Sequence, residues 1–487
     1  MSSSQPDSLA FTDGGSSSSA PFPPSPPKAK PSPPKRHSAS PPTVAIIGAG
    51  SAVFSLGLIR DLCLTERLHG CTVRLMDIDE RRLAAIARLC QRYSDEQGAG
   101  ITVETTADRR EALAGADFVI NTALVTGYDV QREGWAIAQR LGYRHGGSLH
   151  VMHDEPFWIN AYQLAFFDAV AQEVLELCPE AWYLQVANPV FAGCTWLGRR
   201  YPQLKMVGLC HGFAGVYKLA DALSLDHEGL TYEIPGVNHT VFLTHCYHHG
   251  QDVFPLLDEW IATEAETYWQ TCPPSDYMGP VAVDLYKRFG VFPIGDTCNP
   301  GGGSWPWMYH TDAETEARWH EDPALWWRHF FEKGAARVEE IEQAALDESR
   351  PVSESFPPLH SREVMVPMIE SIACDIPRVL IGNVLNTGDF VPGVPRDVAV
   401  EIPLLVSKRG VEGIQTQPLP PAVIAQILKD RVATITLEQA AYDEGSRARL
   451  LDLILTDPWT TSLEQAETLL AEILAMPAHE ALRARYA

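Results

Sequence analysis

The segment of residues 43–51 constrains the fold of this chain more than any other feature of its sequence. Residues 44–47 read Val-Ala-Ile-Ile, a short apolar run typical of a buried strand, and residues 48–51 read Gly-Ala-Gly-Ser. A helical pattern begins near Ala52, directly after the glycines. A buried strand, a glycine turn and a helix in this order form the first half of a βαβ unit, whose helix N-terminus can face an anion. We therefore expect the folded part of the chain to begin with a parallel sheet.

Short apolar runs and helical patterns continue to alternate after this segment. Strands are predicted at residues 44–47, 71–76, 118–122, 182–187 and 205–209, and helices at residues 55–64, 80–96 and 159–177. Repeated alternation of this kind predicts an α/β fold: a Rossmann-like, doubly wound parallel sheet with right-handed crossovers.

Three parts of the chain differ in composition and pattern. Residues 1–42 are rich in Ser and Pro and cannot bury enough apolar surface to offset their ordering entropy, so a disordered tail is expected there. Residues 43–230 hold the predicted Rossmann-like domain. Residues 231–487 are expected to form a second, α+β domain that carries substrate and metal contacts, with an antiparallel segment at 241–247 and long helices at 323–349, 421–443 and 463–476.

Charge and cysteine usage narrow the class of function. The formal net charge of -24 opposes binding to nucleic acid or to an anionic membrane, because a polyanion would be repelled over most of the surface. No apolar run reaches the roughly 18 to 20 residues that span a bilayer. The ten cysteines include no CxxC pair, which is typical of reduced thiols. These features predict a cytoplasmic protein that acts on a small molecule.

The glycine turn predicts a dinucleotide site. Gly48, Gly50 and Ser51 would let backbone amides approach a pyrophosphate at the start of the helix. Val53 occupies the place of the third glycine of the usual fingerprint, so the motif by itself is a weak signal and indicates a different helix packing.

Asp77 ends the second predicted strand, where an acidic side chain can accept hydrogen bonds from the ribose hydroxyls of NAD. This position favours NAD over NADP. Two alternatives stay open: Asp77 could cap the helix that begins near Asp79, and Arg81 and Arg82 could bind a 2′-phosphate.

Polar residues end or follow later strands of the predicted sheet. Asn121 ends the strand at 118–122, Asn188 follows the strand at 182–187, and Asp154 precedes the helix at 159–177. The carboxyl ends of parallel strands face the ligand site, which makes Asn121 a candidate for cofactor binding and Asn188 and Asp154 candidates for substrate binding. Turn formation and helix capping are the alternative roles of these residues.

Two further motifs carry side chains that bind metals. Cys210-His211 follows the strand at 205–209, and Asn238-His239 precedes another apolar run. A thiolate and an imidazole suit a borderline divalent ion. A single Cys and a single His this far apart are more often unrelated, so the pattern alone does not establish a metal site.

Taken in order, the glycine turn, Asn188-Pro189, Gly208-Leu209-Cys210-His211 and Gly236-Val237-Asn238-His239 resemble glycoside hydrolase family 4. The resemblance runs from about Thr43 to the C-terminus. It implies a hydrolase that uses NAD without net redox change: hydride leaves C3 of the sugar, the C2 proton is removed, the C1 leaving group is eliminated, water adds, and the hydride returns.

The resemblance also implies roles for individual residues. Cys210 and His239 match the family's ligands for a divalent metal, usually Mn²⁺, which polarises the C3 carbonyl. His211 matches the position associated with protonation of the leaving group, and Asn238 is expected among the substrate contacts. The base at C2 is a Tyr or an Asp in the family; Asp296 is favoured here because it follows an apolar run in a glycine-flanked loop. Asp284 and Tyr286 are the alternatives.

The Cys-His form of the motif resembles subgroups that act on unphosphorylated α-glucosides, α-galactosides or α-uronides. A uronate would need a cation such as Arg144, Lys287 or Arg288. A dehydrogenase of the malate or lactate type, or one acting on a sugar, is the alternative enzyme, and an inactive sugar or nucleotide sensor is the alternative of another class. Family resemblance further implies a homodimer or homotetramer.

Overall fold

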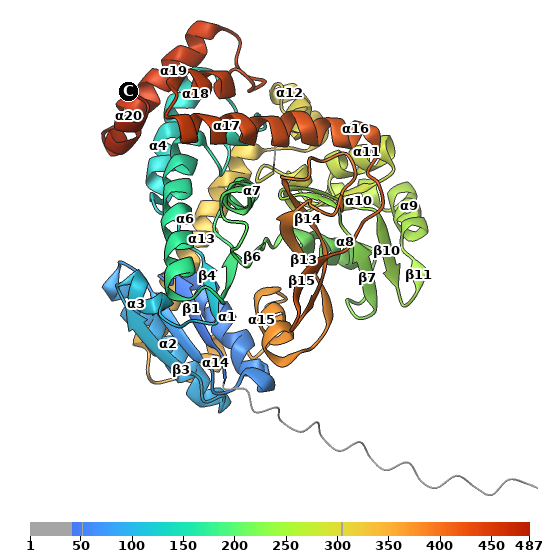
Figure 1. Cartoon of the computed structure of the whole chain (residues 1–487). Helices are drawn as coiled ribbons and strands as arrows, with labels where there is room; N and C mark the ends of the chain where they lie inside the picture. Colours follow the sequence, from blue (N-terminus) through green and yellow to red (C-terminus); the bar gives the residue numbers. More distant parts are fainter. Residues whose placement is uncertain (1–40, 51, 303–304) are drawn as a thin grey trace, which may run out of the picture. The chain divides into compact units, whose positions relative to one another are not determined.

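The computed structural model of this protein describes residues 41–50, 52–302 and 305–487, and Figure 1 shows the whole chain. Most of the expected Ser- and Pro-rich tail, and Ser51 of the glycine turn, lie outside the described residues. The described residues form one compact unit. The account below concerns this unit.

Six parallel strands form one half of a large sheet. They are β1 (Thr43–Ile47), β2 (Thr72–Met76), β3 (Thr102–Thr106), β4 (Phe118–Asn121), β5 (Trp182–Gln185) and β6 (Met206–Gly208). Their order is β3-β2-β1-β4-β5-β6, which is the Rossmann order, so the predicted doubly wound parallel sheet is confirmed. Only β3 was missed, because this edge strand is polar and partly exposed.

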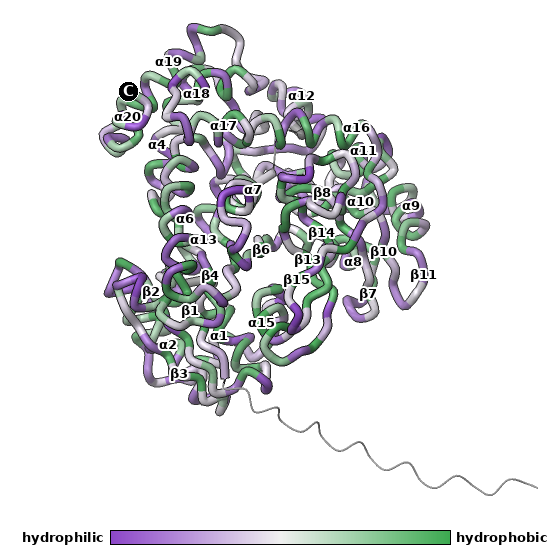
Figure 2. Tube along the Cα trace, viewed as in Figure 1, coloured by the Kyte–Doolittle hydropathy of each residue, from purple (hydrophilic) through white to green (hydrophobic). Residues whose placement is uncertain are grey.

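The residues of β1 show why the sheet needs helices on both faces. Val44 and Ile46 belong to one buried hydrophobic cluster, whereas Ala45 and Ile47 belong to another. Successive side chains of a strand point to opposite faces, so a strand that is apolar throughout must be covered on both. In Figure 2 the hydropathy colours alternate along many of the helices, as expected where one helix face covers a sheet.

The covering helices of the parallel half lie between its strands in sequence. Their bounds are α1 (Ala52–Leu64), α2 (Glu80–Gln97), α3 (Arg109–Leu113), α4 (Gly127–Arg140), α5 (Leu149–Met152), α6 (Phe157–Leu177), α7 (Val190–Arg200) and α8 (Gly215–Ala222). The three helices expected from the sequence are α1, α2 and α6.

The second region extends the same sheet with antiparallel strands. These strands are β8 (Gly236–Val237), β9 (Thr240–Leu243), β12 (Phe292–Ile294), β13 (Arg378–Leu385), β14 (Ala399–Ser407) and β15 (Gly410–Gly413). Strand β13 pairs with β6 through Asn383 and Gly208, and the order continues β13-β14-β8-β9-β12. The expected second region therefore shares one twelve-stranded sheet with the first.

The expected antiparallel segment 241–247 was wrong as a single strand. The chain leaves the large sheet after β9 and enters a separate three-stranded sheet, formed by β7 (Leu230–Glu233), β10 (His245–His248) and β11 (Gln251–Asp252). The chain passes from one sheet to the other at Thr244, whose amide and hydroxyl donate hydrogen bonds to Glu233 of β7.

Helices make up most of the remaining chain. Their bounds are α9 (Phe254–Thr263), α10 (Ala265–Trp269), α11 (Pro280–Phe289), α12 (Ala313–Trp319), α13 (Pro323–Leu346), α14 (Val352–Ser355), α15 (Met365–Cys374), α16 (Pro421–Gln426), α17 (Ala433–Glu444), α18 (Arg447–Ile454), α19 (Leu463–Ala475) and α20 (Glu480–Arg485). The predicted helix at 421–443 contains a π-helical segment, η5 (Ile427–Val432), between α16 and α17. In Figure 1 these three elements run across the top of the view toward α18.

Within the described ranges, none of the helices combines the length and the apolar character needed to cross a membrane. All ten cysteines are free thiols.

Candidate active site

The parallel strands bring their carboxyl ends to one edge of the sheet. The chain leaves β1 at Gly48, β2 at Asp77, β5 toward Asn188 and β6 toward Cys210. Gln163 on α6 connects the ends of β4 and β5, because its amide nitrogen donates to the carbonyls of Ala123 and Asn188 at 3.0 and 2.8 Å. Residues that lie far apart in the sequence thus share one edge, as predicted for ligand-binding residues of a doubly wound sheet.

The glycine turn is held so closely that side chains would not fit. Gly48 has φ of 86°, and a Cβ there would lie 2.6 Å from Cα of Ala123. A Cβ on Gly50 would lie 2.7 Å from Oδ2 of Asp77. The amide of Gly50 donates to that same oxygen at 2.7 Å. The absent side chains let the turn pack against Ala123 and Asp77 and bring the start of α1 to the edge of the sheet, so the turn fits a dinucleotide site.

Asp77 does not cap helix α2. The N-cap of α2 is Asp79, whose side chain accepts from the amide of Arg82, while Asp77 accepts from the amides of Gly50 and Asp79. The capping alternative was therefore wrong, and Asp77 lies beside the glycine turn; its contact with a ribose stays a prediction. Arg81 and Arg82 lie near Glu342 at 3.4 and 3.7 Å, which gives both guanidinium groups carboxylate partners.

We expect Gly48→Ala to weaken NAD⁺ binding at least about tenfold, because a side chain would enter the Ala123 backbone and the left-handed conformation itself costs about 1 to 2 kcal/mol. Fluorescence titration with NAD⁺ measures the affinity, and thermal unfolding measures the stability. Gly57→Ala on helix α1 is the control, since a Cβ there meets nothing within 4 Å. An unchanged NAD⁺ affinity in Gly48→Ala would contradict this role of the turn.

Asn121 lies deeper than the sequence indicated. Its side chain is fully buried and donates to Tyr183 and Gln185, and its Oδ1 accepts from the amide of Ala123. Asn121 therefore supports the loop after β4 from within the sheet. A direct contact between Asn121 and the nucleotide stays a prediction.

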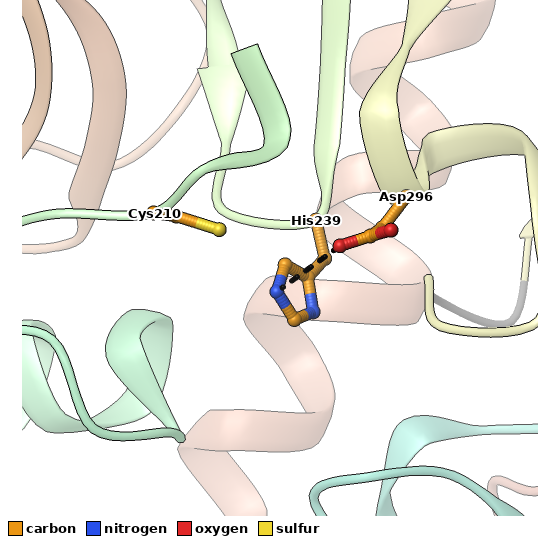
Figure 3. Close-up of side chains that lie close together, drawn as sticks. All are labelled: Cys210, His239 and Asp296. Atoms are coloured by element: carbon orange, nitrogen blue, oxygen red, sulfur yellow. Dashed lines mark ion pairs between the residues drawn. The ribbon is translucent and has the colours of Figure 1, made fainter. Parts of the chain in front are cut away.

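Cys210, His239 and Asp296 come together beyond the sheet edge, and Figure 3 shows their side chains close to one another. Each offers one ligand atom, and these atoms all lie within 4.8 Å of one another. Nε2 of His239 lies 3.7 Å from Oδ2 of Asp296. The sequence expected Cys210 and His239 as metal ligands and Asp296 as a neighbouring base, and the fold gathers all three.

The antiparallel strands explain how residues 210, 239 and 296 meet. Cys210 follows β6, and His239 occupies the two-residue turn between β8 and β9 with φ of 62°. Asp296 follows β12, which pairs with β9, and Thr297 fastens that end by bonding to the backbone of Val241. Each of these three side chains thus follows a strand of the same sheet.

Three residues absent from the sequence prediction complete this cluster. Glu155 is fully buried, and its two carboxylate oxygens have no hydrogen-bond partner among the described residues. Its nearest charged neighbours are Nδ1 of His239 at 3.7 Å and Nη2 of Arg431 at 3.9 Å. Tyr277 also belongs here, because Asp296 and Cys210 contribute to the rise of its pKa after burial. A buried carboxylate whose oxygens accept no hydrogen bond from the described residues is stabilised by positive charge, so Glu155 fits a site that binds a cation.

Asp154 belongs to the same cluster. Its Oδ2 accepts from Nδ2 of Asn188 at 3.0 Å, and its carboxylate forms a second ligand group with Glu155 and His239. Burial raises the pKa of Asp154 to about 7, against the opposing charge of His239. Burial likewise raises the pKa of the Cys210 thiol. A buried thiol and several carboxylates favour their charged forms when a divalent cation binds among them, so this donor set fits a metal.

Asn238 precedes His239 in the turn and is held in place by buried hydrogen bonds. It is fully buried and donates from Nδ2 to Oε2 of Glu401 at 2.9 Å, an oxygen that also accepts from Asn383 at 3.0 Å. Its carbonyl accepts from Nη2 of the buried Arg431 at 3.0 Å. These contacts fix the turn that carries His239, and a substrate contact of Asn238 stays a prediction.

His211 is the most exposed member of the site. Its ring is 53% exposed, and its Nδ1 lies 2.9 Å from Oε1 of Glu363. The hydrogen bond between Nδ1 and Glu363 raises the pKa of His211. Glu363 lies in the loop before α15 and has no local sequence signal that links it to residue 211.

The alternative bases Asp284 and Tyr286, and the cation Arg144 named for a uronate, are paired with residues outside this cluster. Asp284 accepts from Tyr309 and Arg288, and Tyr286 donates to Asp258. Arg144 pairs with Glu316 at 2.7 Å. The structure therefore favours Asp296 over Asp284 and Tyr286, because only Asp296 among these three shares a ligand group with Cys210 and His239.

Comparisons with known proteins identify chains that are similar in sequence and in fold. The model described as family 4 glycosyl hydrolase matches residues 43–225, and that of its C-terminal domain matches residues 234–460. An α-glucosidase of Erwinia rhapontici is 27% identical over 85% of this chain and 93% of its own length. An α-galactosidase of Bacillus subtilis (strain 168) is 25% identical over 89% and 96%. The crystal structure of a 6-phospho-α-glucosidase from gut microorganisms, in complex with NAD and Mn²⁺, has a TM-score of 0.72 at 19% identity and covers 89% of this chain and 97% of its own.

Proposed function

The chain belongs to glycosyl hydrolase family 4, and from this premise we propose that it hydrolyses unphosphorylated α-glycosides with the help of NAD and a divalent metal. The observation that carries the proposal is the group of Cys210, His239 and Asp296, which stands at the same sheet edge as the glycine turn. An ordinary dehydrogenase does not need this group, and the alternative of a malate or lactate type is not favoured.

The residues that would hold the two cofactors are on different strands. Gly48, Gly50 and Asp77 would hold NAD, and Cys210 and His239 would hold the metal, for which Mn²⁺ is proposed. When bound, NAD supplies a reversible hydride acceptor for C3 of the sugar, and the metal supplies a positive charge for the oxygens at C2 and C3. The excess of buried carboxylates beside His239 favours such a charge.

The protein's own side chains would then carry the proton transfers. Asp296 would remove the proton at C2, which a carbonyl at C3 makes acidic. His211 would donate a proton to the departing oxygen at C1. Glu363 would orient the His211 ring by accepting a hydrogen bond from Nδ1. Asn188 and Asp154 would bind substrate hydroxyls, since they form one hydrogen-bonded pair next to the metal group.

The proposal names unphosphorylated substrates because the residues described around Cys210, His239 and Asp296 offer no cluster of cations for a phosphate. Arg431 is buried there and already donates to Asn238. α-Glucosides, α-galactosides and α-uronides all remain within the proposed class.

A panel of nitrophenyl glycosides tests the function directly. We expect turnover of an α-glycoside that requires Mn²⁺ and far less than one NAD⁺ per product molecule, without net NADH. Accumulation of NADH in step with product would support a dehydrogenase instead, and binding without turnover would support a sensor.

Replacement of His211 by Asn should depend on the leaving group. We expect a loss of about 10²- to 10⁴-fold for an alkyl α-glycoside, because its alkoxide needs a proton as it leaves. The loss should be much smaller for a nitrophenyl α-glycoside, whose phenolate leaves without one. His360→Asn, an exposed histidine in the loop before α15, is the control. Equal losses on both substrates would contradict the role as acid.

We propose a homodimer or homotetramer in the cytoplasm, in which residues 43–230 hold the nucleotide and contribute Cys210 to the metal site, and residues 231–487 contribute His239 and Asp296. Exposed apolar side chains on α13 and α4, such as Phe330 and Tyr128, support burial of these helices between subunits. The ten free thiols support a reducing compartment. Light scattering measures the oligomeric state.

A further inference from the structure

A second group of metal-ligating side chains lies outside the active site, at the small sheet of β7, β10 and β11. Asp226 lies in the loop between α8 and β7, His248 ends β10, and His249 begins the turn to β11. One ligand atom of each lies within 4.8 Å of the others. None of these residues belongs to the catalytic cluster.

His249 stands where the backbone disfavours most side chains. His249 and Gly250 form a two-residue turn, since His248 pairs with Gln251, and their φ angles are 48° and 80°. A two-residue turn with positive φ at both positions strongly prefers Asn-Gly or Gly-Gly. A histidine at the first position breaks this local preference, and such exceptions concentrate at functional sites.

The turn also places the imidazoles of His248 and His249 on the same side of the strand. Successive side chains of a strand point to opposite faces, but the positive φ of His249 returns its ring toward that of His248, with ring centroids 4.4 Å apart. Gly229 makes room for this ring, because a Cβ on Gly229 would lie 2.4 Å from Nδ1 of His249. The amide of His249 donates to the carbonyl of Gly229 at 3.1 Å and holds the turn in place.

Both rings direct Nε2 at the carboxylate of Asp226, at distances that suit a shared ion. Nε2 of His248 lies 3.4 Å from Oδ2, and Nε2 of His249 lies 3.7 Å from Oδ1. An N–H to oxygen hydrogen bond is usually about 2.7 to 3.2 Å long. Two ligands of a tetrahedral ion with bonds of about 2.0 to 2.1 Å are about 3.3 Å apart. Nε2 of His248 is moreover buried without a hydrogen-bond partner in the described part of the chain.

We propose that Asp226, His248 and His249 form a second metal site, which takes a divalent ion of the Zn²⁺ type. Two imidazoles and one carboxylate are a set that Zn²⁺ accepts, with a further position open to water. Mn²⁺ prefers oxygen donors, so the two sites differ in the ion that they favour. The bound ion would tie the loop between α8 and β7 to the turn between β10 and β11.

Equilibrium dialysis of the full chain against ZnCl₂ tests the proposal. We expect two equivalents of Zn²⁺ for the wild-type chain and one for His249→Asn, with a loss of affinity at the second site of at least about tenfold. His249→Asn restores the residue that such a turn prefers, so its thermal midpoint in the presence of a chelator should not fall. Asp226→Asn should lose the same equivalent without a change of backbone.

Cys210→Ser separates this site from the catalytic one, because it should remove the other equivalent and leave the second site intact. Cobalt absorption distinguishes them as well, since only an ion bound to a thiolate shows sulfur-to-metal charge transfer. His245→Asn, on the same strand β10, is the control and should retain both equivalents. Two equivalents in His249→Asn and Asp226→Asn, or a single equivalent in the wild type that Cys210→Ser abolishes, would overturn the proposal.

Discussion

Cys210→Ser is expected to reduce glycoside hydrolysis by at least about 10³-fold while NAD⁺ binds as in the wild-type protein. The thiol is one of two predicted metal ligands, and a metal ion contributes several kcal/mol to the stabilisation of charge in the transition state. Serine keeps the size of the side chain but is a poor ligand for a borderline ion. Steady-state assays with saturating Mn²⁺, together with NAD⁺ titration, measure the two effects separately.

The sheet explains why the two effects should separate. Cys210 follows β6, whereas the glycine turn follows β1, and β5 and β4 lie between these strands. A change at one strand end therefore leaves the other in place. Cys272→Ser provides the control, because Cys272 is another half-buried thiol and belongs to no ligand group of the described residues. Full activity in Cys210→Ser would remove the metal role, and a parallel loss of NAD⁺ binding would indicate misfolding instead.

The sequence predicted the parallel half of the sheet well because its strands are buried on both faces. Continuous apolar runs such as that of β1 are recognisable without their partners. Strand β3 lacks such a run, since it lies at the edge and is mostly exposed. Strands β13 and β14 pair with each other, but their place in the large sheet depends on pairing with distant segments, Asn383 with Gly208 and Glu401 with Gly236, and no local pattern reports that pairing.

The residues of the site fall into two groups: those that belong to recognisable motifs, and those that only the fold brings together. Cys210, His211 and His239 follow motifs that resemble the family, and the family assignment is confirmed. Arg431 carries no motif that links it to the site, and η5 and the surrounding packing bury it near Glu155. The Asp-Glu pair at 154–155 was the one local signal that could have pointed to Glu155.

Asp296→Asn is expected to lower turnover by about 10²- to 10⁴-fold, the usual contribution of a positioned base. Exchange of the C2 hydrogen with solvent deuterium should fall by the same factor, because that exchange reports proton removal alone. Asp284→Asn serves as the control, since Asp284 pairs with Tyr309 and Arg288. Retention of C2 exchange in Asp296→Asn, with its loss in Asp284→Asn, would move the base to the other residue.

Metal affinity decides which of two roles Asp296 has. Its Oδ2 is close enough to Nε2 of His239, at 3.7 Å, for Asp296 to be either the base at C2 or a third metal ligand. Asparagine removes the negative charge but keeps the shape and an oxygen. A base that is not a ligand would lose C2 exchange with Mn²⁺ affinity changed less than about tenfold, because even outer-shell partners of a metal affect affinity to that extent. A fall in Mn²⁺ affinity that matches the loss of exchange, with exchange recovered at saturating Mn²⁺, would make Asp296 a ligand and leave Tyr277, its neighbour in the cluster, as the next base to replace.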